Sequence, residues 1–468
     1  MRQPRTVGDH AVVLGASIAG LCATRVASER FRSVTMIDRD DLSDEGESRR
    51  AVPQGRHLHL LLPAGAQLLE RWFPGILAEL RSAGATEVDL CHDFLWYQRG
   101  GAQRRPQSHL RAPAMSRPLL ERLIRRRVEA ITNVTIRSHT SAEGLTADEG
   151  RTHITGVRLG DGSILASDLV VDATGRPARS VAWIEELGYH GPETSQVHID
   201  TRYVTSVLRR TDIPARDWKA AACVGDPSTK RLAILLPIED DRWILTIAGV
   251  HGEAAPNEPA RMLDYVRAFE SPAIGQILGS AERLGDAVTH RFPASQRRHV
   301  ERLNRFPDGW VLLGDSVCSF NPIYGQGMTS AAQQAAALGR ALDRAGRVDC
   351  RFARTYFRAA SRIVASPWSI AVGGDFTYPG TTGKKPLGTD AVNRYMERVT
   401  RAAHHDDQVV IRLSEVISLL RGPQVLLTPA FALRVVRAAR RRAPGAAPTR
   451  PAGTAAATGV GPEEARHV

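Results

Sequence analysis

The stretch from Gly15 to Gly20 reads Gly-Ala-Ser-Ile-Ala-Gly and has the residue types and spacing of a turn that binds phosphate groups. In such a turn the first glycine allows a tight bend, and the last glycine lets the following helix pack closely on the strand. Backbone N–H groups at the start of that helix then face the phosphates. Ser17 stands where a second glycine is usual, and its hydroxyl can donate to a phosphate. The alternative is a glycine-rich turn that binds no ligand.

Asp38 is the second residue with a chemical role, because it ends the next apolar segment, 18 residues after Gly20. A carboxylate at this place accepts hydrogen bonds from both hydroxyls of an adenosine ribose and repels a 2′-phosphate. We therefore expect FAD or NAD, and not NADP, as the tightly bound ligand. The alternative is a solvated aspartate at the end of a strand.

Two more apolar segments each end in a carboxylate beside a glycine. Asp172 stands shortly before Gly175, and Asp315 directly follows Gly314. Carboxylates at these places can hold the hydroxyls of a ribose or a ribityl chain. After Asp315 the chain passes through loop 321–327, rich in glycine, into a predicted helix. The N-terminus of that helix can stabilise negative charge on the ring of a reduced flavin.

The elements around the first turn follow the pattern of a mononucleotide-binding unit. The apolar segments 10–14 and 33–37 are predicted strands, and 21–28 is the predicted helix between them. Together they form a βαβ unit of about 30 residues. Further expected helices cover 63–82, 118–130, 327–341 and 407–442, the last of them broken near Gly422-Pro423 and Pro429. A hairpin is expected over 152–169, a strand over 169–173, and antiparallel strands within 196–208 and 231–250.

Taken together, these motifs and Arg39 resemble the single-component flavoprotein monooxygenases of the para-hydroxybenzoate hydroxylase type. More narrowly, four stretches resemble the bacterial flavin epoxidases of polyether antibiotic pathways. These are Val-Pro-Gln-Gly-Arg-His at 52–57, Ser-Arg-Pro-Leu-Leu-Glu at 116–121, 236–243, and Cys-Ser-Phe-Asn-Pro-Ile-Tyr-Gly-Gln-Gly at 318–327. The resemblance extends from about residue 10 to about residue 440.

The resemblance implies an α/β fold, with a Rossmann-type FAD-binding domain, an inserted and mostly antiparallel β-sheet substrate domain, and C-terminal helices. We expect residues 1–85, 112–185 and 290–345 to form the FAD-binding domain and residues 86–111 and 186–289 the substrate domain. The C-terminal helical region then covers 346–442, and the Ala-, Pro- and Gly-rich segment 443–468 is predicted to be a disordered tail.

The resemblance also implies the roles of site residues. Arg117 is expected to approach a tightly bound FAD, and Arg56 to lie in a loop beside the isoalloxazine. Tyr324, Arg56, Tyr203 and Trp243 are candidates for an apolar substrate pocket. The full set expected to hold the cofactor is Gly15, Ser17, Gly20, Asp38, Arg39, Arg117, Asp172, Gly175, Gly314, Asp315, Pro322, Gly325, Gly327 and Met328.

The implied reaction is a monooxygenation. NADPH or NADH is expected to bind transiently, because no second glycine fingerprint follows a later strand. O₂ then adds at C4a of the reduced flavin as a hydroperoxide, and one oxygen atom passes to the substrate. An alkene needs no catalytic base, whereas a phenol usually does. No buried acid–base pair is evident, and no catalytic residue is predicted. The resemblance to the polyether epoxidases, with a smaller contribution from the missing acid–base pair, therefore implies epoxidation of C=C bonds in an apolar polyketide or terpenoid intermediate of secondary metabolism, such as antibiotic biosynthesis.

Other reactions on the same fold remain alternatives: aromatic or aliphatic hydroxylation, flavin-dependent halogenation and prenyl reduction. A halogenase is expected to carry a Trp-x-Trp-x-Ile-Pro segment, which this sequence lacks. A flavin-binding protein without enzymatic activity is the alternative from a different class.

The composition of the chain argues against several other classes of protein. The net charge of +12 comes from arginines that are not interleaved with stacking aromatics, so no nucleic-acid partner is expected. Five cysteines without a CxxC pair predict neither disulfides nor zinc, and fit a cytoplasmic protein. The chain has no run of 18 apolar residues, so no transmembrane helix is expected. His57 and His59 are expected to be structural, and the cluster 404–407 is not expected to bind a metal. The oligomeric state is not predicted.

Overall fold

The computed structural model describes residues 6–43, 49, 53–210 and 216–440. The predicted disordered tail at 443–468 lies outside the described residues. Within the described ranges, no helix is long and apolar enough to cross a membrane.

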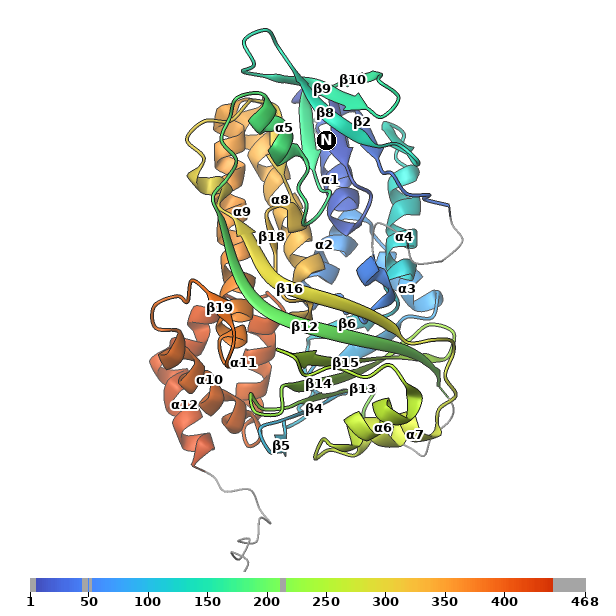
Figure 1. Cartoon of the computed structure of the whole chain (residues 1–468), viewed down its shortest axis with the longest axis vertical. Coiled ribbons are helices and arrows are strands. Elements are labelled where there is room, and N and C mark those ends of the chain that lie inside the picture. The colour runs from blue at the N-terminus through green and yellow to red at the C-terminus, as the bar shows by residue number, and fades with distance from the viewer. Residues whose placement is uncertain (1–5, 44–48, 50–52, 211–215, 441–468) are drawn as a thin grey trace, which may run out of the picture.

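A parallel sheet of five strands occupies one half of the molecule (Figure 1). Its order is β17 (Trp310–Leu312), β11 (Leu169–Asp172), β1 (Gly8–Leu14), β2 (Phe31–Ile37) and β7 (Val134–Arg137). The residues of β1 from Ala11 to Leu14 are fully buried, as expected for a parallel sheet that is covered on both faces. The first of the long helices, α1 (Ile18–Ser28), contacts α4 (Arg117–Glu129) and α8 (Gly327–Ala345). A small sheet of β8 (Ala142–Ala147), β9 (Ile154–Leu159) and β10 (Ile164–Ala166) packs near β11.

A larger sheet of nine strands forms the other half. Its body consists of β12 (Thr194–Arg209), β13 (Ala220–Val224), β14 (Arg231–Ile238), β15 (Arg242–Val250) and β16 (Val288–Arg298). The shorter strands at its edges are β4 (Phe94–Gln98), β5 (Gly101–Ala102), β18 (Cys318–Ser319) and β19 (Thr382–Gly383). All its pairings are antiparallel except that of β4 with β13. Figure 1 shows that the long strands β12 and β16 extend from the first half into the second.

The two faces of the nine-stranded sheet carry different neighbours. Val204, Trp243 and Leu245 pack against α6 (Pro259–Arg267) and α7 (Ala273–Ser280). Tyr203 and Ile244 belong to other clusters, because successive side chains of a strand point to opposite faces. The face without α6 and α7 is the one on which a site can be shared with the first half.

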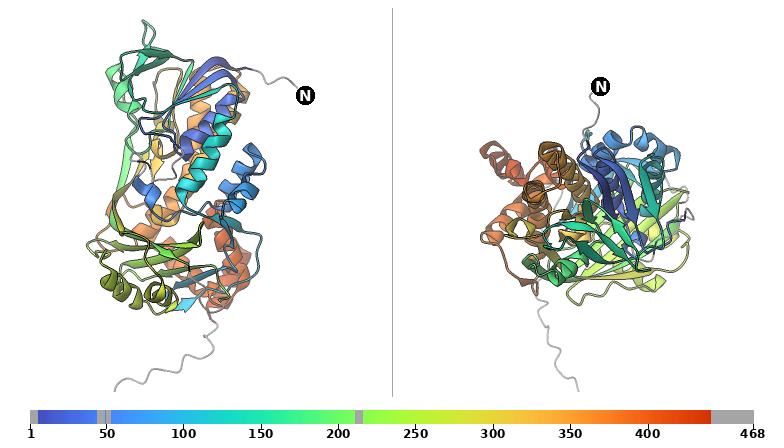
Figure 2. Two further views of the ribbon diagram at one scale, coloured as in Figure 1. Left: turned by 90° about the vertical axis from the view of Figure 1, so that its right-hand side faces the viewer. Right: turned by 90° about the horizontal axis from the view of Figure 1, so that it is seen from above.

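The remaining helices complete the two halves. These are α2 (Pro63–Trp72), α3 (Ile76–Ser82), α5 (Ser180–Glu186), α9 (Cys350–Asp375), α10 (Thr389–Ala403), α11 (Asp407–Ile417) and α12 (Pro429–Ala439), and the strands β3 (Thr86–Asp89) and β6 (Arg111–Ala114) form a small ribbon. Both views of Figure 2 place α10 to α12 beside the nine-stranded sheet. Short 3₁₀ turns cover η1 (Pro53–Arg56), η3 (Gly314–Ser316), η4 (Pro322–Tyr324) and η5 (Pro423–Leu427).

The predicted fold class is confirmed: an α/β fold with a parallel Rossmann-like sheet, a mostly antiparallel second sheet and C-terminal helices. The helix expected over 63–82 is instead two helices, because Gly75 adopts the left-handed φ of +84° between them. The expected domain boundary at residue 290 falls inside β16, which pairs with β12. Strand β16 therefore belongs to the second sheet along its whole length.

Candidate active site

The glycine turn lies between β1 and α1 and leaves no room for side chains at its two glycines. Gly15 has a φ of +95°, and its N–H donates to the Ile37 carbonyl oxygen at 2.8 Å. A Cβ atom on Gly20 would overlap the Gly15 carbonyl oxygen. Both glycines therefore have the roles of the first and last positions of a phosphate-binding turn. Ser17 is the N-cap residue of α1, directly before the first residue of the helix, Ile18.

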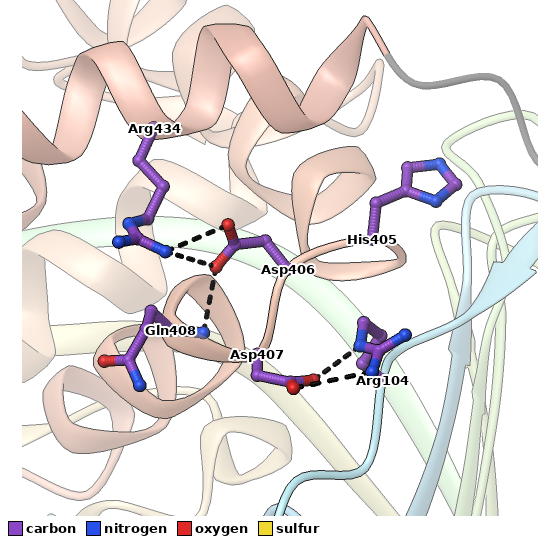
Figure 3. Close-up of a pocket in the computed structure, with 6 residues that line it drawn as sticks. All are labelled: Arg104, His405, Asp406, Asp407, Gln408 and Arg434. Carbon is purple, nitrogen blue, oxygen red and sulfur yellow. Dashed lines mark hydrogen bonds and ion pairs between the residues drawn. The ribbon is translucent and has the colours of Figure 1, made fainter.

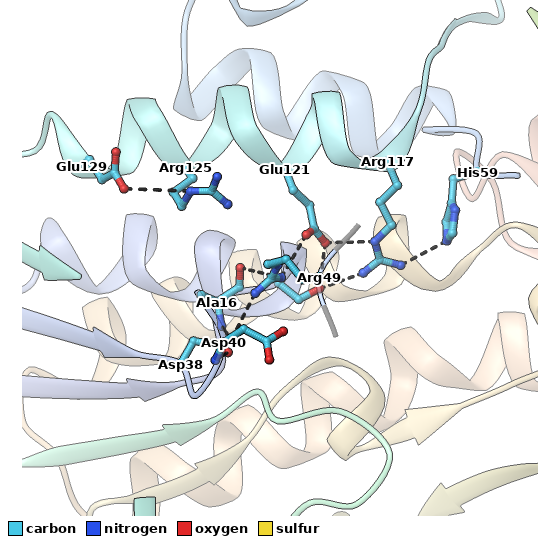
Figure 4. A network of polar contacts seen from close by, with 10 residues as sticks. Ala16, Asp38, Asp40, Arg49, His59, Arg117, Glu121, Arg125 and Glu129 are labelled. Atoms are coloured by element: carbon cyan, nitrogen blue, oxygen red, sulfur yellow. Dashed lines mark hydrogen bonds and ion pairs between the residues drawn. The ribbon is translucent and has the colours of Figure 1, made fainter. Parts of the chain in front are cut away.

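Ser17 is held by two residues of α4 rather than facing open space. Its hydroxyl donates to Glu121 Oε1 at 3.0 Å and accepts from Arg117 Nη2 at 2.7 Å. Arg117 Nε also donates to Glu121 Oε1 at 2.9 Å, and Arg49 Nη2 donates to Glu121 Oε2 at 2.9 Å (Figure 4). Glu121 thus lies between two arginines, directly beside the glycine turn.

Arginine charges dominate the electrostatics of this network. Burial alone raises the pKa of Glu121, but Arg117 and Arg49 outweigh it and lower the pKa to about 2. Burial and the charge of Arg117 lower the pKa of His59 to about 3, so this ring is neutral. Its Nε2 accepts from Arg117 Nη1 at 3.1 Å, and its Nδ1 therefore carries the proton that it donates to the His57 carbonyl oxygen.

Asp38 lies at the end of β2, where an adenosine ribose is expected. Its Oδ2 accepts from the Ala16 N–H at 2.7 Å and pairs with Arg49 Nη1 at 3.2 Å, and its Oδ1 accepts from the Asp40 N–H at 2.9 Å. Arg49 thereby joins Asp38 to Glu121. Arg39 is exposed to solvent.

Asp172 has an internal role instead of an open carboxylate. It is fully buried, and its Oδ1 accepts from the N–H and the hydroxyl of Thr174 at 2.8 and 2.6 Å. Its Oδ2 accepts from the N–H and the hydroxyl of Ser180 at 3.1 and 2.5 Å. These bonds hold the turn that contains Gly175 (φ +82°) and the start of α5. We therefore assign Asp172 to the shape of the turn and not to cofactor contact.

Asp315 has the open carboxylate that Asp172 lacks. It is partly buried in η3, and it makes no hydrogen bond or ion pair within the part of the chain that the structure describes. Burial raises its pKa, and the charges of Arg117 and Arg176 partly oppose that rise. Gly314 before it has a φ of +72°, and a Cβ there would lie 2.8 Å from the Ala19 Cβ.

The loop from η4 to α8 leaves free space in front of a helix N-terminus. Gly325 has a φ of +67°, and a Cβ on Gly327 would meet nothing within 4 Å. The Met328 side chain is buried in the core, so only its backbone can face a ligand, and Pro322 is exposed. This 19-residue helix offers its first N–H groups and a partial positive charge to this space.

The four pocket candidates do not come together. Tyr203 and Tyr324 are joined through Asn321 and Asp375 (below), whereas Arg56 is exposed at the end of η1. Trp243 lies on the opposite face of the sheet from Tyr203, where its ring is 6.4 Å from that of Trp218. The separation follows from the two-residue period of β-strands.

A buried polar group that the sequence analysis missed connects the η4 loop to the nine-stranded sheet. Tyr203 donates its hydroxyl to Asn321 Oδ1, and Asn321 Nδ2 donates to Asp375 Oδ1 at 3.0 Å. The Tyr324 hydroxyl donates to the same Asp375 oxygen at 3.3 Å. Burial raises the pKa of Asp375 to about 7. The single weak signal in the sequence is that Asp375 is the one charged residue between positions 365 and 375.

His57 adds a second buried polar group on this face. Its Nδ1 lies 2.8 Å from the Thr205 hydroxyl, which lies 2.6 Å from the Thr246 hydroxyl. Its Nε2 is buried without a hydrogen-bond partner among the described residues. Burial, and then the nearby His290, lower the pKa of His57 to about 4, so the ring is neutral near pH 7.

Residues 405–407 of the 404–407 cluster line a surface hollow of about 410 Å³ (Figure 3), whereas His404 Nε2 lies 3.0 Å from the Gln98 carbonyl oxygen. Asp406 pairs with Arg434 at 3.1 Å, and Asp407 with Arg104 at 2.5 Å. Each carboxylate is thus neutralised by an arginine. Among residues 6–43, 49, 53–210 and 216–440, no group of three or more His, Cys, Asp or Glu is placed to hold a metal ion.

The residues present fit a dinucleotide that carries a flavin. The glycine turn before the N-terminus of α1 suits a pyrophosphate, and Asp38 suits the adenosine ribose. The half-buried Asp315 has free acceptor oxygens for ribityl hydroxyls, and the open start of α8 suits the charge of a reduced ring. Glu121 and Arg49 belong to this site as well. The spacing of Arg117 and Glu121, four residues apart on one helix, could have revealed Glu121.

Comparison with known proteins identifies the cofactor. A family model described as an FAD binding domain matches residues 10–349. Protein Rv3254 of Mycobacterium tuberculosis is 35% identical over 394 residues, which cover 80% of this chain and 82% of that protein. Kynurenine 3-monooxygenase of Salinispora arenicola is 24% identical over 71% of this chain and 72% of its own length.

A solved structure supports the architecture. The flavin-dependent brominase Bmp2 aligns with a TM-score of 0.66 at 14% identity, over 92% of this chain and 98% of its own. At that identity the match concerns the fold alone, which is shared by FAD-dependent monooxygenases and halogenases. The glycine turn, the open Asp315 and the family match lead to one conclusion, that this chain belongs to the FAD binding domain family.

Proposed function

We propose that the protein is an FAD-dependent monooxygenase that uses NADPH or NADH and O₂ to oxygenate an apolar small molecule. The observation that carries this proposal is the link from Asn321 to Tyr203. Asn321 begins the loop that leads into α8, and Tyr203 lies on the free face of the nine-stranded sheet. The residues proposed to hold the cofactor and the free face of the nine-stranded sheet are therefore next to each other.

Bound FAD supplies the redox chemistry, accepting electrons from NAD(P)H and activating O₂. The protein contributes position and environment. The N–H groups at the start of α1 and the carboxylate of Asp315 are the groups that would hold the dinucleotide. The first turn of α8 stabilises negative charge at its open end. Buried apolar residues around Tyr203, such as Ile199, Leu232 and Phe292, exclude water from a substrate.

Epoxidation of C=C bonds in a polyketide or terpenoid intermediate is the reaction that the sequence resemblance favours. The expectation of epoxidation rested in part on the absence of a buried acid–base group, and the buried carboxyl group of Asp375 removes that support. Aromatic hydroxylation therefore stands as the second candidate, since a phenol usually needs a base. The relative named kynurenine 3-monooxygenase supports the same candidate.

The first experiment tests the cofactor. The purified protein, with added FAD, is expected to show flavin absorbance and to bleach when NADPH or NADH is added without oxygen. Gly20→Val is the matched control, because its side chain would overlap the turn, and it should take up no FAD. A wild-type protein that takes up no FAD contradicts the proposal.

The second experiment tests the reaction, with farnesyl acetate as an alkene probe and 2-naphthol as a phenol probe under ¹⁸O₂. One labelled oxygen atom in farnesyl acetate, with the loss of a double bond, supports epoxidation, whereas labelled naphthalenediol supports hydroxylation. A product that contains bromine when bromide is present indicates a halogenase. Reduction of the flavin without label in either probe contradicts oxygenation of these classes.

A further inference from the structure

Asp375 is a carboxyl group at the C-terminal end of α9 with only 1% of its surface exposed. Its two oxygens are in different situations. Oδ1 accepts from Asn321 Nδ2 at 3.0 Å and from the Tyr324 hydroxyl at 3.3 Å. Oδ2 is buried and has no hydrogen-bond partner among the described residues. A buried polar atom without a partner destabilises the folded protein, so such an atom calls for an explanation.

Residues of the η4 loop and of the nine-stranded sheet pack closely around Asp375. Gly374 precedes it, and a Cβ atom there would overlap the hydroxyl of Tyr324. Asn321 is itself 2% exposed, and its N–H donates to the Ser295 hydroxyl at 3.1 Å. Tyr203, 5% exposed, donates to the Asn321 side chain from the sheet. Residues of β12, β16, the η4 loop and α9 therefore meet around this carboxyl group, and the hydrogen bonds from Asn321 and Tyr324 both reach Oδ1.

The neighbouring groups leave the charge of Asp375 unbalanced. Tyr203, Tyr324 and Tyr378 face it, and burial raises the pKa of each of them, so all three stay neutral near pH 7. His251 approaches the helix end through Thr381, and burial lowers its pKa. Asp375 also lies at the negative end of the α9 dipole. Burial raises its pKa to about 7, so both of its protonation states are accessible near neutral pH.

We propose that Asp375, together with Asn321 and Tyr203, forms a subsite that binds a single hydroxyl group on an otherwise apolar substrate. The proposal rests on the proposed function and specifies its substrate class as an alcohol or phenol. A hydroxyl can donate to the ionised carboxyl and accept from the protonated one, so it pairs with either state of Oδ2. A carbonyl pairs only with the protonated carboxyl, and an ammonium group only with the ionised one. The apolar residues Ile199, Leu232 and Phe292 around Tyr203 suit the rest of such a molecule.

The test uses two probes that differ by one hydroxyl, 2-naphthol and naphthalene, with the protein reconstituted with FAD. Binding is followed by flavin fluorescence and by the fluorescence of the probes. The wild-type protein should bind 2-naphthol about tenfold more tightly than naphthalene, the value of one hydrogen bond to a charged group. Asp375→Asn should lose most of that difference, because a neutral amide is a weaker acceptor than a carboxylate. Asp375→Ala should lose all of it.

Thr381→Val is the matched control. The Thr381 hydroxyl donates to the backbone carbonyl oxygen of Asp375 at 2.7 Å, so this variant disturbs the same helix end and leaves the carboxyl group intact. It should keep the tenfold preference. Between about pH 6 and about pH 8, 2-naphthol should bind the wild type more tightly as the carboxyl ionises, whereas its binding to Asp375→Asn should not change with pH.

The outcomes separate the two proposals. A protein that takes up no FAD contradicts the proposed function, and the probe fluorescence still measures binding to the subsite in that case. Equal affinity for the two probes, or no binding of either, overturns the subsite. So does an Asp375→Asn protein with the affinity and pH profile of the wild type. Flavin uptake is measured separately, so none of these results on probe binding contradicts the proposed function.

Discussion

Two buried carboxyl groups, Glu121 beside the glycine turn and Asp375 beside the sheet, have opposite properties although both are almost fully buried. Glu121 is 5% exposed and Asp375 is 1% exposed. The pKa of Glu121 is lowered to about 2, because the charges of Arg117 and Arg49 outweigh its burial. Burial raises the pKa of Asp375 to about 7, because its hydrogen bonds to uncharged side chains oppose that rise only in part. Burial acts in the same direction on both, so the partners decide the result.

This difference in pKa distinguishes the region around the glycine turn from the region around Asp375. The glycine-turn region is a fixed ionic frame, in which two arginines hold the pKa of Glu121 at about 2. The Asp375 region is able to change its protonation state near neutral pH. A dinucleotide of constant charge suits the first region, and a neutral substrate with a polar group suits the second.

The largest expected effect is that of Glu121→Gln. The substitution removes the anion between two buried arginines and should lower the free energy of unfolding by about 3–5 kcal/mol, as for other buried ion pairs that lose one partner. Urea denaturation of the wild type and the variant measures it. The loss should shrink as the pH falls from about 4.5 towards about 2, because the wild-type carboxylate then becomes protonated and its contribution is lost as well.

Glu129→Gln is the control for this substitution, because Glu129 is on the same helix with its side chain about half exposed. It should change stability by less than about 0.5 kcal/mol. If Glu121→Gln is as mild as Glu129→Gln, the network does not form a fixed ionic frame, and the contrast with Asp375 fails.

The second prediction has the opposite sign. Asp375→Asn should stabilise the protein at pH 8 by up to about 2–4 kcal/mol, because ionising Asp375 in the folded state is unfavourable. Its pKa is raised on folding, so this cost is absent below about pH 4, the pKa of the unfolded chain, and grows until the pH passes about 7. Thermal melts between those pH values measure the difference. A variant that is less stable than the wild type at pH 8 contradicts the neutral surroundings described for Asp375.

The sequence reveals the first region far better than the second. Gly15, Gly20 and Asp38 lie within one βαβ unit, so their spacing along the chain reports their arrangement in space. The same holds for Gly314 and Asp315 at the end of β17. Local spacing also explains why Asp172 is predicted as a cofactor ligand: it follows a strand as such a ligand would, although Thr174 and Ser180 bind both of its oxygens.

The second region is assembled from parts that are distant in the sequence. Tyr203, Asn321 and Asp375 come from β12, the loop before α8 and the end of α9. No spacing rule relates them, because their contacts depend on how two sheets and a 26-residue helix pack. The pairing of Arg49 with Asp38 and Glu121 is equally non-local. Side-chain networks of this kind need the tertiary structure.

The third prediction concerns Ser17, at the position where the fingerprint usually has glycine. Its hydroxyl bonds to Glu121 and Arg117, so Ser17→Ala should destabilise the protein by about 1 kcal/mol. FAD affinity should fall less than about tenfold, since the backbone of the turn remains. Isothermal titration with FAD measures the second quantity. A much larger loss of affinity would mean that the hydroxyl binds the phosphate directly and is not mainly a part of the ionic frame.

The smallest expected effect is that of Trp243→Phe on ligand binding, and it tests which sheet face belongs to the site. Trp243 packs with Trp218 and the α6–α7 face, so the substitution should leave the affinity for 2-naphthol unchanged, although it costs some stability through lost packing. Tyr203→Phe is the paired variant on the other face. It removes the hydroxyl that holds Asn321 and should weaken 2-naphthol binding several-fold. If Trp243→Phe weakens binding as much as Tyr203→Phe, the ligand does not lie on the Tyr203 face. The binding site for 2-naphthol must then be sought beside α6 and α7.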